Sequence, residues 1–181
     1  MKKVVLKFGL ISGVIISTLT AIVVPLCMNG TIDMTDGQVI GYTMMALAYI
    51  AVFLGIRSYR DQNNGGTITF GRAFKVGILI TLVTCAVYVI GWEIVYWGFI
   101  PDFGDKYAAF ALEKMKADGA TPAALAKAQA EMERFKVLYR NPLFNVGMTF
   151  LEIFPVGLIV TLVSAAILRK KTPNAPVVAT A

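Results

Sequence analysis

Four long stretches almost free of charged side chains constrain this chain more than any other feature. Each is about as long as the roughly 20 residues that a helix rising ~1.5 Å per residue needs to cross a hydrocarbon core of ~30 Å. Only Glu93 interrupts the third stretch and only Glu152 the fourth. We therefore predict an all-α membrane protein with four transmembrane helices, at about residues 5–28, 39–57, 73–99 and 145–168.

A secretory signal peptide is the competing interpretation of the first stretch, because Lys2 and Lys3 precede it. The apolar run is longer than a usual signal peptide core, has no small-x-small cleavage site, and lacks the small residue that lipoprotein cleavage requires before Cys27. We expect this helix to be retained. The whole chain, residues 1–181, then forms a single integral membrane domain.

Basic residues gather at one set of predicted helix ends. Ten of the seventeen lie before the first helix, around the connection between the second and third, or after the fourth: Lys2, Lys3, Lys7, Arg57, Arg60, Arg72, Lys75, Arg169, Lys170 and Lys171. Asp61 is the one acid among them, and the connection between the first two helices has only Asp33 and Asp36. Because positive residues near helix ends are held in the cytoplasm, this bias predicts that both termini are cytoplasmic.

The formal net charge of +6 then has a simple explanation. The basic helix ends face anionic lipid headgroups, so we expect membrane lipids as partners. Nucleic-acid binding would require stacking aromatics on a basic soluble surface, and the aromatics of this chain lie at the predicted membrane edges instead. We expect no nucleic-acid partner.

Small residues recur every four positions along the predicted helices. The lines are Gly9, Gly13, Ser17 and Ala21; Ala73, Gly77, Thr81 and Cys85; and Gly157, Thr161 and Ala165. Such lines let helix backbones approach closely within a bilayer. They predict one compact four-helix bundle, with a homo-oligomer contact as the alternative.

The segment from about residue 101 to 142 is predicted to be an extracytoplasmic helical hairpin. Asp118 and Gly119 divide it, and Thr121 followed by Pro122 has the pattern of a helix N-terminus. An apolar stripe follows at alternating spacings of three and four, and four of its members form a candidate partner-binding face: Leu125, Met132, Phe135 and Tyr139. The stripe can pack on the bundle, lie at the lipid interface or bind a partner protein, and the sequence leaves these three open.

The chain contains few residues or motifs that could form a catalytic site. It has no His and two Cys, and it contains no nucleophile elbow, Walker motif, dinucleotide fingerprint or HExxH motif. We expect no catalytic residues, no cofactor and no metal site. An enzyme is the function class that the sequence supports least.

Glu93 and Glu152 form the candidate intramembrane polar site. Counted along their helices from Lys75 and Arg169, both lie about 26 Å from the cytoplasmic rim. If they meet, they can hold a cation or share a proton, because two like charges raise one of the two pKa values. The alternative is that each glutamate lies at the membrane interface with its carboxylate extended toward water.

Three strings in the chain are similar to a known family. They are residues 65–77 (GGTITFGRAFKVG), residues 92–94 (WEI), and the run from residue 139 to 157 that contains YRNP and FLEIFPVG. The chain resembles the small bacterial membrane proteins catalogued as domain of unknown function 4199. This resemblance implies a bacterial inner-membrane protein and no particular activity, substrate or cofactor.

Two function classes follow from the sequence. The favoured one is a structural or interaction protein without catalytic activity, because four helices with few inward polar groups make a poor transport path. The alternative is a small carrier, or a protein that responds to a cation or proton, using Glu93 and Glu152.

Overall fold

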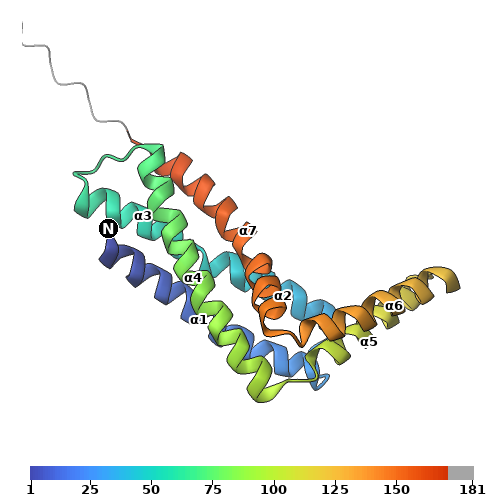
Figure 1. Ribbon diagram of the computed structural model, residues 1–181. Helices are drawn as coiled ribbons and strands as arrows, with labels where there is room; N and C mark the ends of the chain where they lie inside the picture. The colour runs from blue at the N-terminus through green and yellow to red at the C-terminus, as the bar shows by residue number, and fades with distance from the viewer. Residues whose placement is uncertain (171–181) are drawn as a thin grey trace, which may run out of the picture.

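The computed structural model describes residues 1–170 of the chain, except for the side chain of Asn63, and this part is almost entirely helical (Figure 1). Lys171, one of the predicted cytoplasmic residues, lies outside the described residues. The helices of this part, in chain order, are α1 (Lys2–Met28), α2 (Met34–Ala48), α3 (Ile50–Asn63), α4 (Phe70–Phe99), α5 (Phe103–Ala117), α6 (Pro122–Tyr139) and α7 (Pro142–Leu168).

Four segments within the described residues are long and apolar enough to cross a membrane. They are α1, α4, α7 and the pair α2 and α3, which count together as one span over Met34–Gln62. The second span is therefore longer than the predicted residues 39–57. Its start is set by Asp33, whose carboxylate accepts a hydrogen bond from the backbone N–H of Thr35 at 2.7 Å and caps α2.

The second span is interrupted at Tyr49, which separates α2 from α3. The sequence suggested one continuous helix here, because Tyr49 lies in an unbroken apolar run. The side chain of Tyr49 is completely buried, and its hydroxyl donates to the carbonyl oxygen of Ile153 on α7 at 3.1 Å. The interruption therefore coincides with a tertiary contact that no local sequence signal shows.

Helix α4 runs between α1 and α7 and packs closely on both. A Cβ atom on Gly9 of α1 would lie 2.6 Å from the Val83 side chain of α4, and one on Gly157 of α7 would lie 2.5 Å from Thr81. The hydroxyls of Thr81 and Thr161 are hydrogen-bonded at 2.9 Å. All three small-residue lines thus contribute to contacts between helices of the same chain.

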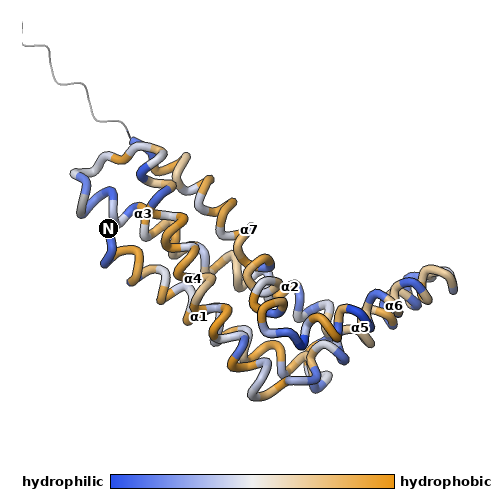
Figure 2. Tube along the Cα trace, in the orientation of Figure 1, coloured by the Kyte–Doolittle hydropathy of each residue, from blue (hydrophilic) through white to orange (hydrophobic). Residues whose placement is uncertain are grey.

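The ends of α1, α3, α4 and α7 that carry the basic residues lie together. Ile68, before α4, forms two backbone hydrogen bonds with Lys170, after α7, at 3.0 and 2.9 Å. Lys3 and Lys7 of α1 share a surface hollow with Arg57 of α3. Figure 2 shows this end as hydrophilic, followed by long hydrophobic helices.

The segment predicted as an outer hairpin contains two helices, α5 and α6, which lie side by side and extend away from the other helices (Figure 1). Gly119 turns the chain between them with a φ of +79°, a conformation that favours glycine. The hydroxyl of Thr121 accepts a hydrogen bond from the backbone N–H of Ala124 at 3.3 Å and caps α6. An ion pair between Lys136 and Asp105, at 3.4 Å, joins the two helices.

Candidate functional site

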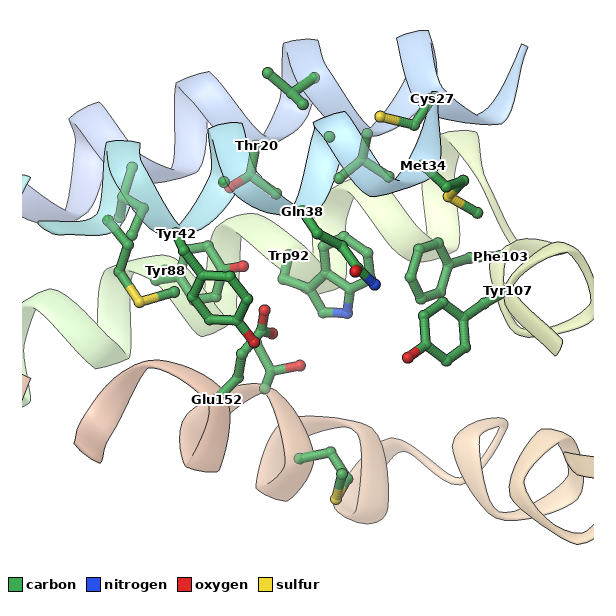
Figure 3. Close-up of a pocket in the computed structure, with 18 of the residues that line it drawn as sticks. Thr20, Cys27, Met34, Gln38, Tyr42, Tyr88, Trp92, Phe103, Tyr107 and Glu152 are labelled. Atoms are coloured by element: carbon green, nitrogen blue, oxygen red, sulfur yellow. The ribbon is translucent and has the colours of Figure 1, made fainter. Parts of the chain in front are cut away.

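A cavity of about 620 Å³ lies between α1 and α2 on one side and α7 on the other, with α4 behind it (Figure 3). Its walls are mainly apolar side chains of α1, α2 and α7. One end is formed by residues of α5 and α6, namely Phe103, Tyr107, Met132 and Phe135. Among the described residues that line the cavity, Glu152 is the single charged one.

The cavity exists because α2 diverges from α7. Helix α3 packs against α1, α4 and α7, whereas α2 packs mainly along α1. The hydroxyl of Ser12 donates to the carbonyl oxygen of Ala48 at 2.8 Å and fixes the end of α2 on α1. The interruption that follows at Tyr49 lets the two halves of the second span take different neighbours.

The opening of the cavity lies between α2 and α7. Tyr42 on α2 is 58% exposed and Leu151 on α7 is 60% exposed, yet both line the cavity. Met148 on α7 is a further exposed lining residue. Together with Gln38 and Glu152, which are also exposed and line the cavity, these three form the rim, on helices long enough to span a membrane.

A buried hydrogen-bond network forms the cavity wall at the junction of α4, α6 and α7. The indole Nε1 of Trp92 lies within hydrogen-bond distance of two acceptors, the Tyr139 hydroxyl at 3.1 Å and the Asn145 Oδ1 at 3.0 Å. The Thr149 hydroxyl also donates to this Asn145 oxygen, at 3.3 Å. Asn145 is completely buried. Burial raises the pKa of the Tyr139 hydroxyl, which therefore stays protonated and neutral while it accepts the hydrogen bond from Trp92.

Glu152 lies at the cavity near three aromatic side chains. Figure 3 shows Tyr42 and Tyr88 at the same end of the cavity as Glu152, with Trp92 further along. Glu152 itself is exposed to the opening. Pro155 lies inside α7 and has no N–H, so the carbonyl oxygen of Leu151 lacks its usual helical donor. The surroundings of Glu152 thus include aromatic side chains and one backbone carbonyl that lacks a helical donor.

Glu93 lies in different surroundings. It does not line the cavity, and its Oε2 accepts a hydrogen bond from the indole N–H of Trp97, one turn along α4, at 2.8 Å. Its Oε1 is buried and has no partner among the described residues. The pairing of Glu93 with Glu152 stays a prediction, and no described contact joins them.

The apolar stripe of α6 mostly faces inward. Met132, Phe135 and Tyr139 line the cavity, and Tyr139 is buried against Trp92, Tyr96 and Phe103. Leu125, further along the arm, is partly buried. Among the three predicted interpretations, these contacts support packing on the long apolar helices, and partner binding by the stripe stays a prediction.

Sequence reasoning missed several of the residues that build this site, including Tyr42, Tyr88, Trp92 and Asn145. A signal for Asn145 exists, because an amide inside an apolar helix must find a buried partner. The tyrosines carry no such signal, since a tyrosine near a membrane edge is common whether or not it lines a cavity.

Residues 7–170 match the family described as Protein of unknown function (DUF4199), and the chain belongs to this family. No curated protein and no solved structure matches the chain.

Proposed function

We propose that this family member is a membrane protein that binds a small amphiphilic molecule in the cavity, without converting it chemically. The observation that carries the proposal is the cavity itself. Its volume of about 620 Å³ falls within the ~300–1,000 Å³ typical of small-molecule sites, and its apolar walls with a few polar groups are also typical.

The shape of the cavity favours a ligand that enters from lipid. The rim residues Tyr42, Met148 and Leu151 lie on the sides of spanning helices, so the opening faces the hydrocarbon region once the four spans are in a bilayer. At the roughly 30 Å³ that a water molecule occupies in the liquid, the cavity has room for about 20 non-hydrogen atoms. That is the size of one alkyl chain with a small head, and a two-chain phospholipid is much larger.

We place the chain in the inner membrane of a bacterium with both termini in the cytoplasm. The basic helix ends lie together at one end of the structure, and positive residues are retained on the cytoplasmic side. In this orientation α5 and α6 form an extracytoplasmic arm, and the cavity lies in the outer half of a four-helix membrane domain. The exposed apolar side chains of α1, α4 and α7 are solvated by lipid.

An interaction protein is the second candidate function. The arm formed by α5 and α6 extends beyond the spanning helices (Figure 1), where a partner or a second copy of the chain has room to contact it. Ligand binding is the better supported of the two, because three residues of the proposed partner face line the cavity instead.

Filling the cavity tests the proposal. Gly41 on α2 lines the cavity, and a Cβ atom there meets nothing within 4 Å, so the side chain of Gly41→Phe starts from an unobstructed position at the cavity. Gly147 on α7 is equally unobstructed but does not line the cavity, which makes Gly147→Phe the matched control.

Native mass spectrometry of the protein released from nanodiscs measures bound 1-dodecylglycerol, a neutral single-chain amphiphile. The parent and Gly147→Phe are expected to carry one bound molecule, and Gly41→Phe none. Equal binding by all three proteins, or no binding by the parent, would contradict the proposal.

A further inference from the structure

We infer that the ligand of the cavity is a cation, an alkyl chain that ends in an ammonium group, with Glu152 as its counter-ion. This inference rests on the proposed function and adds the chemical class of the head group. It starts from the charges of the cavity: Glu152 is acidic, and no basic residue lines the cavity within the described part of the chain.

Basic residues at the neighbouring end of the arm have other partners. Lys136 forms ion pairs with Asp105 at 3.4 Å and with Glu133 at 2.7 Å, and Arg140 pairs with Asp105 at 3.3 Å. The carboxylate of Glu152 therefore has no basic side chain in the cavity to balance it. An anionic head group would meet a like charge at this position, whereas a cationic one would be attracted.

Aromatic rings complete the head-group site. Tyr42 and Tyr88 lie at the Glu152 end of the cavity, with Trp92 further along (Figure 3), and Tyr139 also lines the cavity. An ammonium group over a Trp or Tyr face is attracted by the negative face of the ring, most strongly where water is excluded. The carbonyl oxygen of Leu151, left without a helical donor by Pro155, adds negative partial charge next to Glu152.

The remaining walls suit an alkyl tail. From the Glu152 end the cavity continues between Leu19, Val23 and Met28 of α1 and Phe103 and Phe135 of the arm. One carboxylate is too few for a stable metal site, because Ca²⁺ and Mg²⁺ take six or more oxygen ligands. A single charge among aromatic rings, continuous with an apolar slot, matches a lipophilic cation.

Head-group chemistry is tested with Trp92 as the reporter. Trp92 and Trp97 are the two tryptophans of the chain, so Trp97→Phe leaves one indole, which lies in the cavity wall. The probes are dodecyl chains brominated near their ends, which quench an indole on contact. Three probes share the same brominated dodecyl chain and differ in their head group, which is trimethylammonium, a glycerol ether or sulfate.

In nanodiscs at equal membrane content, the ammonium probe is expected to bind about tenfold more tightly than the glycerol ether, a factor that corresponds to about 1.4 kcal/mol. The sulfate is expected to bind most weakly. Glu152→Gln removes the preference for the ammonium. Glu93→Gln keeps it, since Glu93 is a carboxyl on a neighbouring helix that does not line the cavity.

Equal quenching by the three probes, or an ammonium preference that survives in Glu152→Gln, overturns the inference and leaves the proposed function standing. No quenching by any probe overturns both.

Phosphatidylcholine and phosphatidylglycerol with brominated chains identify the source of the cation. Quenching by phosphatidylcholine equal to that by the single-chain ammonium assigns the site to a lipid head group, which contradicts a free alkylammonium ligand.

Discussion

The indole Nε1 of Trp92 on α4 lies 3.1 Å from the hydroxyl of Tyr139, the last residue of α6. This contact joins the arm to the central spanning helix and closes one end of the cavity. Tyr139 also packs on Tyr96 and Phe135, with ring centroids 5.4 and 5.1 Å apart. The position of the arm therefore depends on a small number of aromatic side chains.

Replacing Trp92 with Phe is expected to loosen the arm. The change removes the indole donor of the buried Tyr139 hydroxyl, which costs about 1–3 kcal/mol for a buried polar group left unpaired, while the Asn145 oxygen keeps the hydrogen bond from Thr149. Hydrogen exchange of the α6 amides should become faster. Trp97→Phe is the control, because Trp97 is 48% exposed and bonds only Glu93 of its own helix. Equal exchange in the two variants would contradict the role of Trp92.

Replacing either of two glycines of α7 with alanine is expected to change the free energy of unfolding in opposite directions. At Gly157 the new Cβ would lie 2.5 Å from Thr81 and 2.6 Å from the ring of Tyr49, so Gly157→Ala should lower the free energy of unfolding by about 1–3 kcal/mol. At Gly147 nothing lies within 4 Å, so Gly147→Ala should raise it by up to about 1 kcal/mol through helix propensity. Thermal unfolding in one mild detergent measures both changes. Destabilisation of equal size would show that α4 and α7 do not pack as described.

The inner face of α6 is expected to be sensitive to charge. Met132→Asp together with Phe135→Asp places two carboxylates in the apolar end of the cavity, which should detach the arm and expose it to protease. Val137→Asp is the control, because Val137 lies on the same helix and is 72% exposed. Limited proteolysis in nanodiscs, where both membrane faces are accessible, measures the effect. Unchanged cleavage of the double variant would rule out a docked arm.

Topology is tested by fusion to alkaline phosphatase, which is active only outside the cytoplasm. Fusions after Asn29 and after Gly119 are expected to be active, and a fusion after Gly65 inactive, because Gly65 lies in the short connection bracketed by Arg57, Arg60, Arg72 and Lys75, and basic residues around short loops are retained in the cytoplasm. The reverse pattern would place the cavity in the inner half of the membrane and the basic helix ends outside.

Much of the architecture could be predicted from the sequence. A helix that crosses a bilayer needs about 20 residues with almost no charge, and such stretches are visible in the sequence. The four spans, the cap at Thr121 and the packing roles of Gly9 and Gly157 all follow from composition or spacing. Family membership was also visible, in strings such as Trp92-Glu93-Ile94.

The cavity could not be predicted, because it results from how two helices diverge. The interruption at Tyr49 coincides with the hydrogen bond that its hydroxyl donates to the carbonyl oxygen of Ile153, 104 positions away in the chain. Depth along a helix could be counted for Glu93 and Glu152, but the direction of each side chain around the helix depends on packing. Equal depth therefore did not imply equal surroundings: Glu152 lines the cavity, and Glu93 bonds Trp97.

Quenching of Trp92 by a neutral amphiphile tests the central claim, a ligand-binding cavity open to lipid, most directly. In the Trp97→Phe background, brominated 1-dodecylglycerol in nanodiscs should quench Trp92, which is only 5% exposed and is reached through the cavity. The quenching should persist with Gly147→Phe and disappear with Gly41→Phe. Quenching that is the same in all three proteins, or absent from all three, would contradict the account.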